Sequence, residues 1–193
     1  MRNTLKFLYP TLILAAICLV VSLALSSTDM ITKARIAEIE AKNTEKAMSR
    51  VLKAETYTEK KLETDGEEIN YYEASDGDTL AGLIFITSAN GYGGEVKVMT
   101  AILPDKSIKA IEILDVSSET PGLGQNAAKE SFYGQFSGIS GGSDITVVKS
   151  GGGDMLQINA ITGATITSRA VTKAVNEARK YSEKILPEEA DDE

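Results

Sequence analysis

The first strong pattern along the chain is an uncharged apolar run from Phe7 to Leu25. Ten of its nineteen residues are Leu, Ile or Val, and nineteen helical residues span about 28 Å, close to the thickness of the bilayer core. Ala24-Leu25-Ser26 resembles a signal-peptide cleavage site, but the run is longer than a usual signal core. We therefore expect residues 1–28 to form the N-terminus and a retained single-pass transmembrane helix.

The charges beside this run leave its orientation open. Arg2 and Lys6 precede it, and Lys33, Arg35 and Lys42 follow it. The positive-inside rule is therefore close to a tie, and a long following domain is translocated largely regardless of such charges.

A second helix is predicted from Asp29 to Ala54, because apolar or small residues recur there at spacings of three and four. The stripe is weak and consists mostly of alanine and methionine. We expect a helical connector over residues 29–60 that docks on its own domain; a stalk or a coiled segment that binds a partner is the alternative.

From residue 61 the pattern changes to short strands and turns, followed by one long amphipathic helix. The final helix, from about Ala164 to Leu186, carries an apolar stripe at helical spacing. A short helix is expected over Ala127–Phe136. The predicted strands are Ile69–Glu73, Leu80–Thr87, Glu95–Leu103, Ser107–Val116, Asp144–Lys149 and Leu156–Ala160. The sequence thus predicts an α+β domain over residues 61–187 with a largely antiparallel sheet and flanking helices, and an acidic tail over 188–193.

Composition removes several kinds of chemistry from consideration. The 193 residues include no histidine, which excludes a Ser-His-Asp triad and a histidine zinc site. The single cysteine, Cys18, excludes an internal disulfide and a cysteine-ligated iron–sulfur cluster. A net charge of −8 disfavours a nucleic-acid partner. Redox chemistry in this chain would therefore need a bound cofactor.

Two glycine-rich patterns bear on nucleotide binding. Gly122-Leu123-Gly124-Gln125-Asn126-Ala127 matches G-x-G-x-x-A, but five residues separate it from the preceding strand and the expected acidic residue is missing. We reject a Rossmann site on these grounds. The chain also lacks the G-x-x-x-x-G-K-[ST] pattern of a P-loop.

The segment from Asn159 to Ser168 joins a strand to the final helix and is rich in hydroxyl groups. A helix start of this kind leaves backbone N–H groups unpaired, and together with the helix dipole they favour an anion, above all a phosphate. An ordinary Ser or Thr helix cap is the alternative that the residues alone allow.

Three segments in order carry a resemblance to a known family. Thr162-Gly163-Ala164-Thr165 resembles the flavinylation motif of the FMN-binding subunits of Rnf complexes and of sodium-pumping NADH:quinone oxidoreductases. Glu119-Thr120-Pro121-Gly122-Leu123-Gly124 resembles the family's flavin-lining segment, and Gly91-Tyr92-Gly93-Gly94 resembles its glycine-rich turn. With the N-terminal anchor, the resemblance covers nearly the whole chain, and the short length is closer to the Rnf G subunit.

The resemblance implies a set of site residues. It implies covalent attachment of FMN through its phosphate to Thr165. The remaining cofactor-binding residues that it implies are Thr162, Gly163, Ala164, Glu119, Thr120, Gly122, Leu123 and Gly93; it implies no catalytic side chain and no metal. Asn159 stands where the family pattern has an aspartate, a departure that puts the efficiency of flavin attachment in question.

The resemblance also implies a function and a location. The chain would be an electron-transfer flavoprotein subunit of an ion-translocating ferredoxin:NAD oxidoreductase, with the other subunits, a flavin transferase and the lipid bilayer as partners. It would have no turnover of its own, and its FMN domain would lie on the extracytoplasmic side of the inner membrane. Two alternatives remain: an FMN-binding subunit of a related quinone reductase or other membrane reductase, and a membrane-anchored binding domain without flavin.

Overall fold

A computed structural model describes residues 2–64, 67–151 and 154–186. The chain forms two compact units, Met1–Thr44 and Glu45–Glu193. The predicted acidic tail, residues 188–193, lies outside the described residues.

The first unit consists of the helix α1 (Arg2–Val51), whose last turns belong to the second unit. By length and composition, the segment Tyr9–Lys33 of α1 could cross a membrane, with a mean hydropathy of 2.2. Its apolar side chains are exposed, as Leu14 and Leu19 illustrate, which suits contact with lipid. The predicted membrane segment therefore lies within one continuous helix that also includes most of the expected connector.

A tyrosine lies at the point where the chain leaves α1 and enters the sheet. The Tyr57 hydroxyl donates a hydrogen bond to the Leu52 carbonyl (2.7 Å) and accepts one from the Ala54 N–H (3.2 Å). These bonds satisfy backbone groups that the end of a helix leaves without partners. The helix consequently ends at Val51, before the predicted Ala54.

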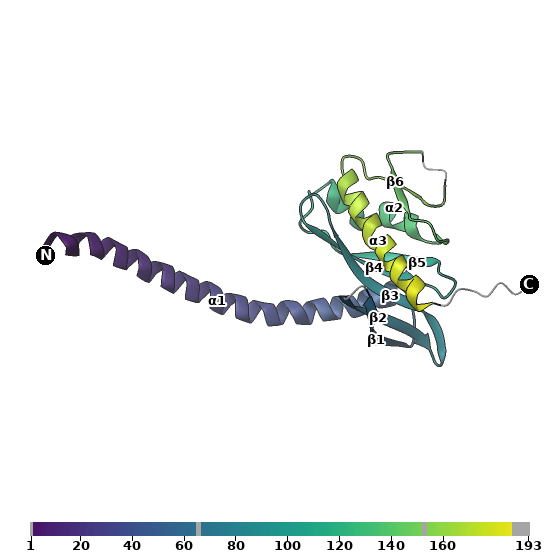
Figure 1. The fold of residues 1–193 in the computed structure, drawn as a ribbon, viewed down its shortest axis with the longest axis horizontal. Coiled ribbons are helices and arrows are strands. Elements are labelled where there is room, and N and C mark those ends of the chain that lie inside the picture. Colours follow the sequence, from purple (N-terminus) through teal and green to yellow (C-terminus); the bar gives the residue numbers. More distant parts are fainter. Residues whose placement is uncertain (1, 65–66, 152–153, 187–193) are drawn as a thin grey trace, which may run out of the picture. The chain divides into compact units, whose positions relative to one another are not determined.

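A five-stranded antiparallel sheet forms the centre of the second unit (Figure 1). Each strand pairs with the next along the chain, so that short turns suffice as connections. The strands are β1 (Thr56–Thr64), β2 (Glu67–Asp76), β3 (Thr79–Asn90), β4 (Glu95–Ile102) and β5 (Ile108–Asp115).

Alternating side chains on β3 and β4 face two different covers. On one face, Leu83 and Val98 lie in the clusters that contain residues of α3 (Thr165–Ile185), the long helix that crosses the sheet in Figure 1. On the other face, Ile84 and Met99 pack with Ala47, Met48 and Val51 from the last turns of α1, and with Leu52. Both faces of the central strands are thus buried.

The remaining elements complete the cover beside α3. Short helical segments follow the loop after β5, and two short strands pair in parallel. They are η1 (Gly124–Ala128), α2 (Glu130–Tyr133), η2 (Gly134–Phe136), β6 (Thr146–Val148) and β7 (Gln157–Asn159). The predicted α+β class, with a largely antiparallel sheet and flanking helices, is confirmed.

The structure corrects the expected connector over residues 29–60. Strand β1 occupies the end of that range, and compact contacts of the domain begin at Glu45 rather than at residue 61. Strand β1 has the sequence TYTEKKLET and lies at the sheet edge, where charged side chains protect against pairing with other chains. Its low apolar content removed the alternation by which strands are predicted.

One buried hydroxyl on the covered sheet generates a stability prediction. Thr100 on β4 is fully buried, and within the described residues its Oγ1 atom has no hydrogen-bond partner. Since an unsatisfied buried polar atom costs free energy, Thr100→Val should raise the free energy of unfolding by about 1 kcal/mol. Urea denaturation of the full chain in detergent micelles measures the change.

Thr87→Val is the matched control, because Thr87 is also buried on this sheet but its Oγ1 donates to the Ala174 carbonyl (2.8 Å). That substitution should lower the free energy of unfolding by about 1 kcal/mol. Equal effects of the two substitutions would show that hydrogen bonding does not distinguish these sites.

Candidate functional site

A cavity of about 570 Å³ opens where three segments meet: the β3–β4 turn, the loop after β5 and the start of α3. Six of the nine residues that the resemblance implied line this cavity: Glu119, Thr120, Leu123, Gly163, Ala164 and Thr165. The cavity is thus formed by segments far apart in the sequence that the fold brings together.

The start of α3 is shaped by Gly163 and Ser168. Gly163 has a φ of +77°, a backbone conformation that residues with a Cβ rarely adopt. The Ser168 Oγ atom accepts a hydrogen bond from Ile161 N–H (3.0 Å) and donates one to the Ala164 carbonyl (2.9 Å). The turn is therefore held from the helix side, by a serine that the sequence analysis did not single out.

No side chain caps the N-terminus of α3 within the described residues. The cap residue is Ala164, which has no hydrogen-bonding side chain, and Thr165 is the first residue of the helix and half-buried. The alternative of an ordinary hydroxyl cap is therefore not what the structure has. The N–H groups of the first turn and the positive end of the helix dipole remain available for an anion beside the Thr165 hydroxyl.

The loop after β5 turns sharply at Pro121 and Gly122. The Leu123 N–H donates to the Thr120 carbonyl at 3.1 Å, and Gly122 has a φ of +77°. Proline at the second position and a left-handed glycine at the third are typical of a type II β-turn. The turn fixes Thr120 and Leu123 on the cavity lining.

The Glu119 carboxylate joins all three segments of the cavity. Glu119 is only 2% exposed. Its Oε1 accepts hydrogen bonds from the backbone N–H groups of Tyr92 (2.7 Å) and Gly93 (3.1 Å), and its Oε2 accepts one from the Thr167 hydroxyl (2.7 Å). The expectation that Glu119 is a cofactor-lining residue is thus extended: it also holds the cavity walls together, and it is not a solvated loop carboxylate.

Glycines allow this carboxylate to approach the backbone. A Cβ at Gly91 would lie 2.1 Å from Glu119 Oε1, and a Cβ at Gly124 would lie 2.4 Å from Oε2. Neither separation is sterically possible without movement. The glycine-rich turn and the loop after β5 therefore pack on opposite oxygens of one buried carboxyl group.

The other three implied residues, Thr162, Gly122 and Gly93, are not part of the cavity lining. Thr162 is exposed, Gly122 shapes the β-turn, and Gly93 donates its N–H to Glu119. The lining instead includes four residues that were not implied: Tyr92, Gly124, Ile166 and Thr167. Each lies within or next to a quoted motif, so the motifs locate the cavity but not every side chain in it.

Three large apolar side chains lie exposed on the cavity lining. Tyr92 is 73% exposed, Ile166 52% and Leu123 42%. Among the described residues of the second unit, the only other exposed large hydrophobic residue is Met155. An apolar lining beside uncapped N–H groups suits a ligand that combines a flat apolar ring with an anionic group.

Asn159, which replaces the family's aspartate, lies at the end of β7 and outside the cavity lining. Its backbone N–H donates to Gln135 Oε1 (2.9 Å), and its carbonyl accepts from Gln135 Nε2 (3.3 Å). The residue thus ties β7 to the short helical segments. Within the described residues, no group of three or more acidic, cysteine or histidine side chains could hold a metal ion.

Comparison with protein families matches residues 91–180 to the FMN-binding domain. The G subunit of the Na(+)-translocating ferredoxin:NAD(+) oxidoreductase complex of Acetobacterium woodii is 36% identical over 180 residues, which cover 86% of each chain. The proton-translocating counterpart of Clostridium ljungdahlii is 41% identical over 109 residues, which cover 56% of this chain and 57% of that protein.

Among solved structures, two NADH-quinone reductase C subunits have a similar fold. The protein of Parabacteroides distasonis has a TM-score of 0.55 at 20% identity, and the match covers 68% of this chain and 74% of that one. NqrC of Shewanella oneidensis has a TM-score of 0.50 at 20% identity, with 62% of each chain covered. The fold and the sequence relatives agree: the chain belongs to the family of G subunits of ion-translocating ferredoxin:NAD(+) oxidoreductase complexes.

Proposed function

We propose that this chain is an electron-transfer flavoprotein subunit of an Rnf-type membrane complex, and that it carries FMN linked through phosphate to Thr165. The G-subunit relatives and the FMN-binding domain support a flavin electron-transfer subunit. The observation that carries the finer proposal is the position of Thr165: a half-buried hydroxyl residue in the cavity, at an uncapped helix start.

The residues of the cavity fit both parts of FMN. Leu123, Ile166 and Tyr92 offer exposed apolar surface for an aromatic ring. The first-turn N–H groups of α3 and the helix dipole would stabilise the remaining negative charge of a phosphodiester by about 0.3–1 kcal/mol. A volume of about 570 Å³ lies within the usual range for cofactor sites.

Attachment requires one covalent step at Thr165. A bond forms between its Oγ1 and the phosphorus of the flavin donor, while the bond from that phosphorus to the donor's leaving group breaks. The hydroxyl proton is lost in the same exchange. Gly163 before the threonine leaves the backbone open to a flavin transferase, which we propose as a partner.

When bound, FMN supplies the one- and two-electron chemistry, and the protein supplies its placement. The Thr165 ester keeps the cofactor at a very high effective concentration, so that it is not lost on the extracytoplasmic side. The β-turn at Thr120–Leu123 fixes one wall of the cavity. Outer-sphere electron transfer needs no acid–base side chain, which agrees with a chain that lacks histidine.

The other subunits of the complex would receive and donate the electrons, and coupling to ion transport would take place in the assembled complex. We place the anchor, Tyr9–Lys33 of α1, in the lipid bilayer of the inner membrane and the FMN domain on the extracytoplasmic side. The names of the two relatives specify protons in one case and sodium in the other, so the family includes both ions.

A second candidate is an FMN-binding subunit of a related quinone reductase. The likeness of the fold to NADH-quinone reductase C subunits favours it. Purification of the chain from its native membrane with its companion subunits separates the two candidates, because the complexes contain different partners.

Thr165→Ala should abolish covalent flavin, because it removes the only atom proposed to carry the phosphoester. The measurement is the yellow fluorescence of the protein band after denaturing electrophoresis, with the chain co-expressed with its flavin transferase. The wild type should fluoresce and Thr165→Ala should be dark.

Two controls sharpen this test. Thr165→Ser keeps a hydroxyl and should remain fluorescent, and Thr120→Ala removes another hydroxyl residue of the cavity lining and should also remain fluorescent. A fluorescent Thr165→Ala band would overturn the site. A wild-type protein that stays dark with the transferase present would instead favour a domain without covalent flavin.

Glu119→Ala should lower the free energy of unfolding by about 2–4 kcal/mol and strongly reduce covalent flavin. The substitution leaves two backbone N–H groups and the buried Thr167 hydroxyl without their acceptor. Glu119→Gln should cost only about 1 kcal/mol, because an amide oxygen can still accept both N–H bonds and its NH2 group can donate to Thr167. Urea denaturation and flavin content per protein measure both effects.

Glu95→Ala is the control, because this exposed glutamate of β4 also accepts a hydrogen bond, from Ser88. Its effect on unfolding should stay within about 0.5 kcal/mol. If Glu119→Ala were as mild as Glu95→Ala, the carboxylate would not hold the cavity walls together.

A further inference from the structure

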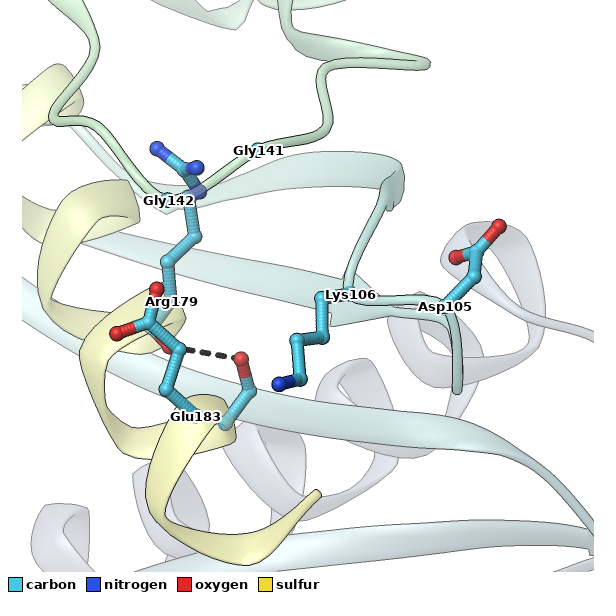
Figure 2. A pocket seen from close by; sticks show the side chains of 7 residues that line it. Asp105, Lys106, Gly141, Gly142, Arg179 and Glu183 are labelled. Carbon is cyan, nitrogen blue, oxygen red and sulfur yellow. Dashed lines mark hydrogen bonds between the residues drawn. The ribbon is translucent and has the colours of Figure 1, made fainter. Parts of the chain in front are cut away.

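A second cavity lies near the other end of α3, away from the proposed flavin site (Figure 2). It has a volume of about 420 Å³ and shares no lining residue with the flavin cavity. Its walls come from the β4–β5 turn, the glycine segment before β6 and the second half of α3. The lining residues are Asp105, Lys106, Gly141, Gly142, Arg179, Ser182 and Glu183.

Arg179 is the unusual group in this cavity, because it is a cation that is only 5% exposed. Its Nη1 donates a hydrogen bond to the Ser143 carbonyl at 2.7 Å. Among the residues that the structure describes, no carboxylate lies within ion-pair distance of its guanidinium. Burial accordingly lowers the pKa of Arg179 from its ordinary value. A guanidinium has five N–H donors, so one carbonyl uses only part of its capacity.

A buried charge of this kind calls for compensation. Moving a cation out of water costs several kcal/mol unless an opposite charge and further hydrogen bonds accompany it. Holding the Ser143 carbonyl alone would be served equally well by a neutral donor. In Figure 2 the guanidinium reaches toward the segment of Gly141 and Gly142, whose lack of side chains leaves the backbone accessible.

Lys106 adds a second cation to the cavity. It is half-buried, and no hydrogen bond or ion pair of its ammonium group is found among the described residues. Its φ of +64° makes it the only non-glycine residue in the described part of the chain with a left-handed backbone. Such strain is typical of positions that a ligand site constrains.

The two carboxylates of the cavity do not neutralise these cations directly. Asp105 accepts hydrogen bonds from the N–H (2.9 Å) and the hydroxyl (2.6 Å) of Ser107, and Figure 2 shows its carboxylate turned away from Arg179. Glu183 is exposed, so water and salt screen its charge. The buried part of the cavity is therefore electropositive, although the whole chain carries −8.

The geometry points to a binding site for a phosphate group in this cavity, with the Arg179 guanidinium as the principal ligand and Lys106 as a second positive charge. Guanidinium groups recognise phosphate oxygens in bidentate geometry. The cavity is larger than inorganic phosphate, so the natural ligand is a phosphate ester with a small organic group. Either a soluble phosphate ester or the headgroup of an anionic lipid supplies this chemistry.

Thermal unfolding of the full chain tests the site, with the chain in phosphatidylcholine nanodiscs and inorganic phosphate or glycerol 3-phosphate added at constant ionic strength. The midpoint Tm should rise saturably with either phosphate and not with chloride, because a ligand that binds only the folded state stabilises it.

Three variants assign the effect to this cavity. Arg179→Gln should weaken phosphate binding by about tenfold or more. Lys106→Asn removes the charge but tolerates the left-handed backbone, and it should weaken binding by about threefold to tenfold. Lys109→Gln, at an exposed position of β5, is the control with the same loss of charge and should bind as the wild type does.

Lys106→Asn also guards against a folding defect in Arg179→Gln, because Lys106 is not in the core. Thr165→Ala should leave the phosphate response unchanged, which separates this site from the proposed flavin site. The inference is overturned if the wild type shows no saturable rise in Tm, or if Lys106→Asn and Lys109→Gln respond alike.

Nanodiscs that contain phosphatidylglycerol distinguish the two sources of phosphate. If the ligand is a lipid headgroup, these nanodiscs should raise Tm without added phosphate, and Lys106→Asn should remove that rise. If the ligand is soluble, Tm should depend only on the added phosphate ester. A rise in phosphatidylglycerol that all variants share would reflect general charge and would contradict a lipid headgroup in this cavity.

Discussion

One buried carboxylate organises the candidate flavin site. Glu119 accepts hydrogen bonds from two backbone N–H groups of the β3–β4 turn and from the Thr167 hydroxyl in the first turn of α3. The three segments of the cavity are therefore mutually positioned by a single side chain. A buried carboxylate is stable only when its oxygens are satisfied, so the arrangement requires glycines at the positions where a Cβ would block the approach. The glycine-rich motifs are the steric consequence of this constraint.

The long helix α3 provides the frame on which this site is built. Its apolar stripe packs on the sheet through Val171, Ala174, Val175 and Ala178, all fully buried. The packing leaves the N-terminus of the helix at the cavity, where Thr165 and the uncapped N–H groups lie. The same helix carries Arg179 to the second cavity. Burial of one helix face therefore fixes the position of two electropositive sites, one by its dipole and one by a side chain.

Much of the domain could be predicted from sequence, because its elements follow clear periodicities. The stripe of α3 and the alternation of β3 and β4 both produce strong patterns. Strand β1 was missed because an edge strand faces water on most of its length and needs no apolar alternation. Motifs located the cavity, but its side chains depend on contacts between distant segments. The bond from Thr167 to Glu119 spans 48 positions, and the single sequence carries no signal for such a pairing.

The central claim is the chemical bond between Thr165 and flavin, and peptide mass spectrometry of the chain isolated from its native membrane tests it most directly. The account predicts one peptide that contains Thr165 and is heavier by FMN less one water, with fragmentation that locates the addition on that threonine. An unmodified Thr165 peptide in a preparation that retains its companion subunits, or FMN on another residue, would contradict it.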